Sequence, residues 1–296
     1  MATSLPFFLA SAFTTSPFGG NPAVTIFLKG ELPTETMQKL ATTFNQPMVS
    51  YITEALPSST EKVAAFGIRW FTPSHEVPLC GHATLVAAKV ILQTGLVSKK
   101  VEVINLHTQN GVVVSAIKGD GEWLEVQLPA NIVEEVTPED KARVSALVAD
   151  AVGKPDVAVK NVLKGGKGME HGLLIELDEK ENLGGIEVDP SKLLTTGWDV
   201  NVITTACTDG SALFVSRMFA PMHLKSIGGE DHVCGSAHCM LTPYWSRKLQ
   251  FAKGGEMKAR QVSKRGGDIK VAWDEEREII RLMGQVVIYT KGEVLL

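Results

Sequence analysis

The alternation of hydrophobic and polar positions predicts a chain built mainly of short strands. Alternating or β-branched runs occur in both halves of the sequence, separated by turn residues, which is typical of strands that bury one face. These runs are Ala23–Leu28, Val101–Leu106, Val112–Ile117, Trp123–Leu128, Asp156–Leu163, Leu173–Leu177, Ala212–Met218, Ile269–Trp273 and Glu278–Leu282. Tight turns such as Arg265–Asp268 favour antiparallel neighbours.

Two surface helices stand out between these strands. Thr34 is expected to cap a helix that places apolar residues at i, i+3, i+4 and i+7 from Met37 and that ends before Pro47. Thr137, followed directly by Pro138, is expected to cap another. Both helices are predicted to cover strands and to face solvent on their polar sides.

Two other helical segments differ because they are apolar on most of their circumference. His82–Leu92 has a polar residue only at a few positions, so strands must enclose it on all sides. Gly235–Leu249 is its counterpart, although Pro243 is expected to kink that helix or remove a hydrogen bond. One enclosed helix per half predicts an α+β protein of two similar domains, each an antiparallel β-barrel wrapped around a central helix.

A repeated motif supports this division into halves. Residues 69–75 read R-W-F-T-P-S-H, and residues 217–223 read R-M-F-A-P-M-H, 148 positions later. Residues 76–83 and 230–237 then share the pattern E-x3-C-G-x-A, in the same order. A repeat of this kind indicates an internal duplication. We expect domains at 1–129 and 130–296, with an alternative in which the last strand returns to the first domain.

Composition narrows the class of protein without naming a function. The 296 residues are 44% hydrophobic and 21% charged, which excludes disordered and collagen-like chains. The net charge of −4 gives no global attraction to nucleic acid or to anionic membranes. No apolar run is long enough to span a bilayer, and the opening segment Met1–Phe13 resembles a first strand more than a signal peptide. A cytoplasmic protein with reduced thiols is therefore expected.

The repeat gives two of the four cysteines equivalent positions, directly before the two enclosed helices. At helix N-termini, unpaired N–H groups bind anions and favour thiolates, so Cys80 and Cys234 are candidate acid–base groups. If the halves face each other across a pseudo-twofold axis, the two thiols flank one carbon in a shared cleft. One thiolate would then remove a proton and the other thiol would return one, as a cofactor-free racemase requires. The plainer alternative is that both cysteines are small buried residues.

Other residues near the two turns are candidates for binding or proton relay. His82 and Asp231 are expected beside the thiols, whereas Arg69 and Arg217 are expected to anchor loops. Backbone N–H groups and a side chain offer substrate-binding candidates: Asn21, Gly81, Ala83, Gly235, Ser236 and Ala237. Asn21 has the alternative role of a turn residue. The run of His and Cys between residues 232 and 239 lacks the spacing of a metal motif, so neither metal nor cofactor is expected.

At these motifs the chain resembles the PhzF-like family, named for the phenazine-biosynthesis isomerase, and more distantly diaminopimelate epimerase. The resemblance is carried by residues 17–24 (P-F-G-G-N-P-A-V), 69–73, 76–84, 230–231, 233–238 and 243–246. It implies two barrel domains with an active site between them, a homodimer, and ligand-site roles for Gly81, His82, Asp231 and Ser236. A proline in the second central helix is normal for the family.

One departure from the family concerns the chemistry directly. Family members carry a general acid–base glutamate after the first helix, where this chain has Met48, and methionine cannot carry a proton. A second departure puts His232 where the family has proline. Three alternatives remain open: an epimerase with two thiols, an isomerase or lyase that uses His82, Asp231 or His232, and a ligand-binding protein without catalysis.

Together these features predict a cofactor-independent isomerase of the epimerase or racemase type. The expected substrate is a small metabolite that bears a carboxylate, and proton abstraction is expected next to that group. Nucleic acid and membranes are not expected partners.

Overall fold

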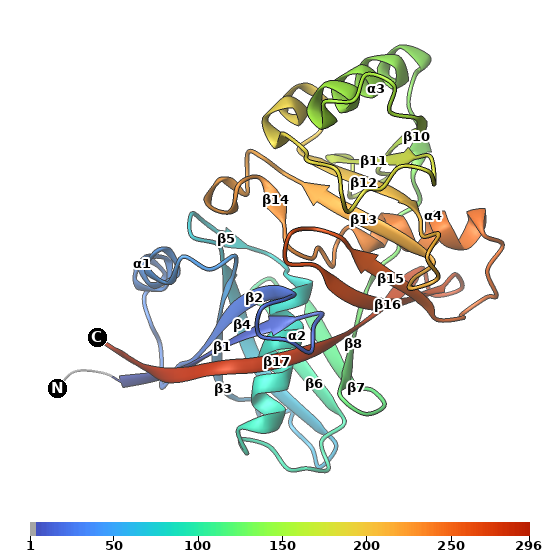
Figure 1. Ribbon diagram of the computed structural model, residues 1–296. Coiled ribbons are helices and arrows are strands. Elements are labelled where there is room, and N and C mark those ends of the chain that lie inside the picture. Colours follow the sequence, from blue (N-terminus) through green and yellow to red (C-terminus); the bar gives the residue numbers. More distant parts are fainter. Residues whose placement is uncertain (1–3) are drawn as a thin grey trace. The chain divides into compact units, whose positions relative to one another are not determined.

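A computed structural model describes residues 4–296 and divides them into two units of similar size (Figure 1). The first unit holds the described residues up to Gln127 together with Met283–Leu296, and the second holds Leu128–Leu282. The C-terminal segment therefore groups with the N-terminal half. Along the described chain, no helix combines the length and the apolar character that a membrane crossing requires.

Eight strands of the first unit close into a barrel, because each strand pairs with two neighbours and the last returns to the first. In order around the barrel, they are β1 (Ser4–Ala12), β2 (Asn21–Phe27), β3 (Val49–Ala55), β4 (Val63–Phe71), β6 (Val103–His107), β7 (Val113–Lys118), β8 (Trp123–Pro129) and β17 (Ile279–Leu295). Closure leaves the barrel without an exposed edge. A two-residue strand, β5 (Glu76–Val77), pairs with the end of β4.

The helix α2 (Gly81–Gln93) lies inside this barrel, as its apolar circumference predicts. All residues from His82 to Ile91 are buried, and the sequence is rich in Ala, Val and Leu, which fit a narrow interior. Lys89 is the one charged side chain on the buried stretch, and its ammonium group pairs with Glu122 at the surface. The predicted fold class, α+β barrels around a central helix, is confirmed.

The barrel is not wholly antiparallel, because β2 with β3 and β4 with β6 run parallel. Parallel neighbours need a crossover connection, and helices supply it in both places. The helix α1 (Thr34–Phe44) connects the first pair, and α2 connects the second. The expected cap at Thr34 is wrong: Pro33 takes the N-cap position, and the Thr34 hydroxyl accepts a hydrogen bond from Arg69 instead.

The second unit repeats the same order of pairings. Its strands are β9 (Glu134–Glu135), β10 (Val159–Lys164), β11 (Gly172–Leu177), β12 (Val200–Ala206), β13 (Phe214–Phe219), β14 (Glu230–Asp231), β15 (Met257–Gln261) and β16 (Gly267–Asp274). Its helices are α3 (Pro138–Val152), η1 (Pro190–Thr195), η2 (Lys225–Ile227) and α4 (His238–Lys248). As in the first unit, β11 with β12 and β13 with β15 are parallel, whereas β12 with β13 is antiparallel. This shared topology agrees with an internal duplication.

Pro243 lies inside α4 without ending the helix. Because proline has no N–H, the carbonyl of Cys239 one turn earlier loses its helical donor. The N–H of Asn131 donates to that carbonyl at 2.9 Å, so the group is satisfied from outside the helix. The expected break is therefore avoided by a tertiary hydrogen bond.

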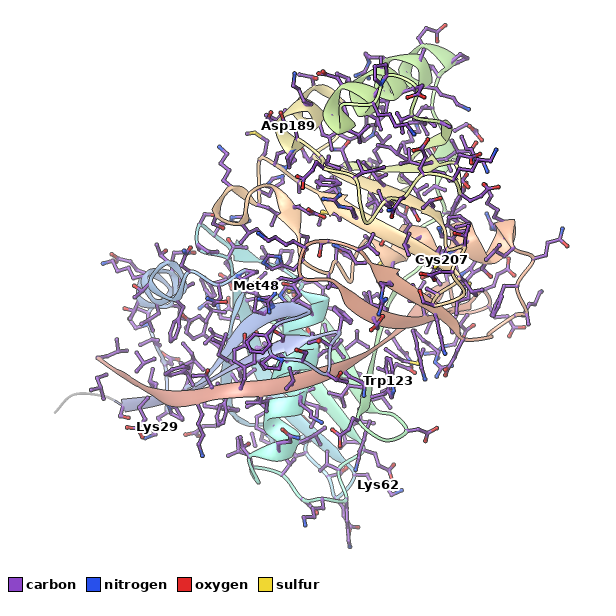
Figure 2. All side chains as sticks on the ribbon, in the orientation of Figure 1. Lys29, Met48, Lys62, Trp123, Asp189 and Cys207 are labelled. Atoms are coloured by element: carbon purple, nitrogen blue, oxygen red, sulfur yellow. The ribbon has the colours of Figure 1, made fainter. Side chains whose placement is uncertain are left out.

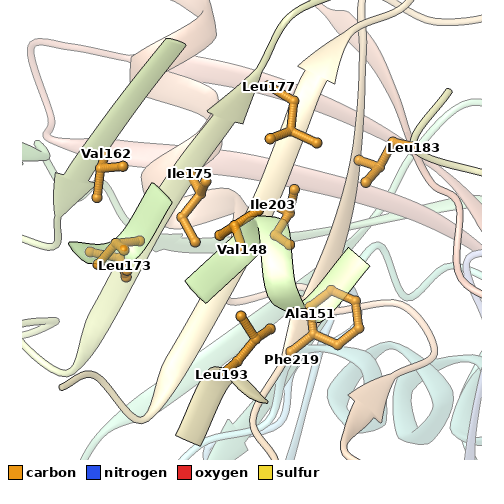
Figure 3. Close-up of a cluster of buried hydrophobic side chains, with 11 residues drawn as sticks. Val148, Ala151, Val162, Leu173, Ile175, Leu177, Leu183, Leu193, Ile203 and Phe219 are labelled. Carbon is orange, nitrogen blue, oxygen red and sulfur yellow. The ribbon is translucent and has the colours of Figure 1, made fainter. Parts of the chain in front are cut away.

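Each unit also has an outer core between its sheet and a covering helix. In the first unit, Met37 and Ala41 of α1 pack on β2, β3 and β4. In the second, Val148 and Ala151 of α3 and Leu193 of η1 cover β11 to β13, as Figure 3 shows. Thr137 caps α3 as predicted, because its side chain accepts the N–H of Asp140 at 3.1 Å.

Candidate functional site

An arginine–glutamate pair fixes the start of each repeated turn. Arg69 donates from Nε and Nη2 to the two carboxylate oxygens of Glu76, at 2.8 and 2.7 Å. Arg217 and Glu230 form the same bidentate pair, at 2.7 and 2.8 Å. Each guanidinium also lies 5.1 Å from the ring of the phenylalanine two residues further along its strand. The repeated arginines therefore anchor loops, and both turns leave the sheet from equivalent places.

In the first unit the turn brings a thiol against an imidazole. Cys80 is the N-cap residue of α2 and has extended backbone angles, with φ at −146°. Its Sγ lies 3.3 Å from Nδ1 of His82, and Nδ2 of Asn21 lies 3.4 Å from the same ring nitrogen. Cys80 is half-buried, whereas His82 is only 7% exposed. The thiol thus has a titratable partner within hydrogen-bond distance, and a proton can pass between them.

In the second unit the equivalent thiol is enclosed. Cys234 is only 4% exposed, and its Sγ lies 3.3 Å from the hydroxyl of Ser236. Burial and, secondarily, the charge of Asp231 raise the pKa of the Cys234 thiol far above its ordinary value. This side chain is therefore a protonated thiol at neutral pH, although its sequence motif matches that of Cys80.

Backbone N–H groups at both turns are available to an anion. The first intrahelical bond of α2 runs from the Thr84 N–H to the Cys80 carbonyl, so the N–H groups of Gly81 and Ala83 precede it. Among the described residues these two groups have no acceptor, and the same holds for Gly235 and Ser236 in the second unit. Each turn can therefore hold a carboxylate oxygen at the positive end of a helix. The N–H of Ala237 faces the Cys234 sulfur instead.

Three further polar residues lie around the second turn. The Asp231 carboxylate accepts the N–H of Val233 at 3.2 Å. Burial, with a smaller contribution from the charge of Arg265, lowers the pKa of His232 to about 4, so its ring is neutral. Burial likewise lowers the pKa of His238 to about 4, and its Nδ1 donates to the Cys234 carbonyl at 2.9 Å.

The methionine that departs from the family pattern is part of the first unit's interior. Met48 is 6% exposed, and its carbonyl accepts the N–H of Val24 at 2.9 Å at the start of β3 (Figure 2). The described structure provides no proton-carrying side chain at this position. The other two cysteines lie elsewhere: Cys207 is near the surface beside Asp209 (Figure 2), and Cys239 is buried in α4. Among the described residues, none of the four cysteines forms a disulfide bond.

Across residues 4–296, no three His, Cys, Asp or Glu side chains gather as metal ligands would. A cavity of about 480 Å³ lies at the C-terminal end of α4, beside Arg247, Phe251 and Trp273. It is at the opposite end of that helix from the Cys234 turn, and its lining mixes both charges.

Sequence reasoning missed one residue at the second turn. Gln261, the last residue of β15, is fully buried and hydrogen-bonds to two backbone groups of the Asp231–Cys234 segment. No local pattern marks Gln261, because its contact depends on the parallel pairing of β13 with β15. The only available signal is a glutamine at a position where strand alternation predicts a buried residue.

Comparison with known proteins agrees with the motifs. The family model described as "Phenazine biosynthesis-like protein" matches residues 10–292. An uncharacterized isomerase of Halalkalibacterium halodurans is 31% identical, with 98% of each chain covered, and a human phenazine biosynthesis-like domain-containing protein is 33% identical over 90% of this chain and 91% of its own. A PhzF-family structure from Enterococcus faecalis superimposes with a TM-score of 0.81 at 28% identity, covering 99% of this chain and 100% of that one. A hydroxyproline epimerase from Agrobacterium vitis shares the fold, with a TM-score of 0.61 at 13% identity over 99% of this chain and 93% of its own.

Proposed function

Since the chain belongs to the phenazine biosynthesis-like family and is an isomerase, we propose that it moves a proton at a carbon next to a carboxylate of a small metabolite, without a cofactor. The Cys80–His82 contact carries this proposal. A thiol 3.3 Å from an imidazole can lose its proton to that ring and become a base. The full-length likeness to isomerases favours catalysis over the alternative of a binding protein without activity.

In the proposed step, the Cys80 thiolate takes a proton from the substrate carbon. The C–H bond breaks, an S–H bond forms, and the electron pair moves into an enolate that includes the carboxylate. N–H groups such as those of Gly81 and Ala83 stabilise the charge that develops on oxygen. A proton from an acid then returns to carbon, which completes the isomerisation without any net loss of atoms or electrons.

The second turn is proposed to supply that acid and a second set of N–H donors. A thiol with a raised pKa, like that of Cys234, is protonated before the reaction, so it suits the donor role better than the role of first base. Asp231 would hold or relay a proton beside it. In this version both repeated thiols take part, with unequal roles.

Deuterium incorporation tests the proposal. The protein is incubated in D2O with a panel of L-amino and hydroxy acids and of unsaturated carboxylic acids, and mass spectrometry and NMR record deuterium next to the carboxylate. We expect incorporation with at least one substrate, a loss of about a hundredfold or more in Cys80→Ala, and an unchanged rate in the control Cys207→Ala. Equal rates in Cys80→Ala and wild type would refute the role of the thiol.

A second candidate is a single-base isomerase that shifts a hydrogen along the substrate. The difference between the thiols favours it, because only Cys80 has an imidazole partner within hydrogen-bond distance. This version predicts that Cys234→Ala keeps most of the activity. A carboxyl group at residue 48 would be buried and would have a raised pKa, so Met48→Glu is expected to add a general acid–base group where the family has one. A new isomerisation in Met48→Glu, absent from Met48→Gln, would support the single-base version.

The homodimer implied by the family resemblance stays a prediction. Analytical ultracentrifugation of the full chain tests it directly. A single species of twice the monomer mass is the expected result, and a monomer at micromolar concentration would contradict it.

A further inference from the structure

The residue four positions after each repeated cysteine holds the carbonyl of that cysteine. Thr84 and His238 occupy this place in the two copies of the motif, and both side chains are fully buried. The Thr84 hydroxyl donates to the Cys80 carbonyl at 2.7 Å. Nδ1 of His238 lies 2.9 Å from the Cys234 carbonyl, and because a carbonyl only accepts, this ring nitrogen is the donor. The contact is therefore common to both turns, although the residue type differs.

The direction of the held carbonyl determines where the next N–H points. The cysteine C=O and the glycine N–H that follows it belong to one planar peptide group, and in a trans peptide these two bonds point in opposite directions. Along the described residues, no peptide bond is cis. A donor that keeps the Cys80 carbonyl directed into the helix therefore keeps the Gly81 N–H directed out of its N-terminal end, where an anion binds. The same relation holds between Cys234 and Gly235.

The two side chains differ in how much of this hydrogen bonding they provide. In α2 the backbone N–H of Thr84 also donates to the Cys80 carbonyl, at 3.0 Å, so that carbonyl has two donors. In the second unit α4 begins at His238, whose N–H donates to the Gly235 carbonyl at 3.1 Å instead. The His238 ring thus takes the place of the helical donor at the Cys234 carbonyl.

Aromatic packing fixes the orientation of the His238 ring. The ring centroid lies 6.0 Å from that of Phe214, and Phe214 stacks on Trp245 with centroids 5.5 Å apart. The indole N–H of Trp245 donates to the Thr204 hydroxyl at 3.0 Å, which attaches this stack to β12. A buried ring that is already held in place loses little further freedom when it donates. The Cys234 carbonyl therefore has a rigid partner.

We propose that Thr84 and His238 are positioning residues, each of which aims the glycine N–H of its turn at a substrate carboxylate by holding the cysteine carbonyl of the same peptide group. Each acts through the backbone rather than on the substrate. The direction of the N–H is then set before any ligand arrives, which reduces the entropy cost of binding. The inference deepens the proposed function and rests on it for the identity of the anion, whereas the peptide group can be observed without a substrate.

NMR relaxation dispersion of the free, full-length protein tests whether the peptide group is held. His238→Asn and His238→Leu form a matched pair, because the two new side chains have the same shape but only asparagine carries an N–H donor on Cγ, where histidine carries Nδ1. We expect microsecond-to-millisecond exchange at the Gly235 amide in His238→Leu, and flat profiles there in the wild type and in His238→Asn. Equal profiles in the two variants would overturn the role of the hydrogen bond.

The first unit provides a test that does not depend on the folding of variants at His238. Thr84→Ser keeps the hydroxyl, whereas Thr84→Val keeps the shape of the side chain and removes the donor. Exchange is expected at the Gly81 amide in Thr84→Val, but with a smaller amplitude than at Gly235 in His238→Leu, because the backbone N–H of residue 84 still holds the Cys80 carbonyl. Identical profiles in Thr84→Val and Thr84→Ser would contradict the proposal. In the wild type, a ring proton found on Nε2 of His238 instead of Nδ1 would also overturn it.

Kinetics separate positioning from the chemistry itself. Once the deuterium assay has identified a substrate, His238→Leu should raise KM about tenfold and lower kcat less, because a misdirected N–H weakens binding of the carboxylate in the ground state and the transition state alike. His238→Asn should recover part of that loss. A fall in kcat with an unchanged KM would contradict a positioning role. A failure to find any substrate would refute the proposed function, while the dispersion profiles would still decide whether the two side chains hold the peptide groups.

Discussion

The two Cys-Gly turns have matching sequences and matching backbone anchors but different surroundings. Both begin at a bidentate arginine–glutamate pair and both lead into the central helix of their unit. In the first, the thiol is half-buried and contacts an imidazole, whereas in the second it is enclosed and contacts a hydroxyl. A duplication can therefore preserve the backbone turn and its anchoring pair while the side chains around the thiol diverge toward unequal roles.

The largest expected effect comes from the residues that contact the two thiols. His82→Asn keeps a polar side chain but removes the proton acceptor from Cys80, so the isomerisation rate should fall by a factor of about 10² to 10⁴. Ser236→Ala removes the hydroxyl from Cys234 and should cost less than about tenfold. The two losses are measured by comparing the rate of deuterium incorporation in each variant with that of the wild type. Equal losses would mean that the two turns do equivalent work.

The two arginine–glutamate pairs should also differ in how much each contributes to the stability of the protein. Side chains of Arg217 and Glu230 are 10% and 18% exposed, against 13% and 35% for Arg69 and Glu76. Arg217 also donates to the carbonyl of Ile186 at 2.5 Å. Arg217→Leu should therefore lower the free energy of unfolding by about 3 to 5 kcal/mol, and Arg69→Leu by about 1 to 2 kcal/mol. Urea denaturation provides both values, and a larger loss in Arg69→Leu would contradict this ranking.

The buried His238 should make the second unit sensitive to acid. Its pKa in the folded protein is about 4, below the ordinary value of 6.5, so between these values the unfolded chain binds a proton that the folded one does not. Stability should be unaffected by this group above pH 6.5 and should fall by about 3 kcal/mol as the pH drops toward 4. Denaturation midpoints of wild type and His238→Asn, measured from pH 7.5 to 4, test this. Parallel curves for the two proteins would mean that His238 does not titrate in this way.

A smaller effect is expected at the proline of α4. Pro243→Ala adds an N–H, but the Cys239 carbonyl already accepts a hydrogen bond from Asn131. The free energy of unfolding should change by less than about 1 kcal/mol. Asn131→Pro, which removes that donor, should cost clearly more. A large gain in Pro243→Ala would show that the tertiary hydrogen bond does not replace the helical one.

The sequence alone was sufficient to predict the features that depend on a short-range pattern of residues. The repeat, the apolar circumference of α2 and the Thr137 cap could all be read from spacing. The Thr34 cap failed because a distant arginine takes its hydroxyl, and Pro243 did not break α4 because a distant N–H compensates. Both outcomes depend on tertiary partners.

The unequal environments of the two thiols could not be predicted for the same reason. Cys80 and Cys234 share the local sequence C-G-x-A, and the only local difference is the x position, which is His82 in the first turn and Ser236 in the second. Their difference in burial depends on tertiary packing, which the local sequence does not report. His82 could be recognised as a candidate because it is only two positions after Cys80 in the sequence, and the structure places the two side chains in contact.

The difference between the Cys80 and Cys234 thiols is tested most directly by the rate at which each reacts with iodoacetamide in the native wild-type protein. Samples alkylated at pH 7.5 are quenched over time, digested and analysed by mass spectrometry, with the half-buried Cys207 and the buried Cys239 as references in the same chain. We predict that Cys80 reacts at least about a hundredfold faster than Cys234, because it is accessible and has an imidazole partner whereas Cys234 remains a buried, protonated thiol. Equal rates for Cys80 and Cys234, or a faster reaction of Cys234, would contradict the assignment of the two turns to different tasks.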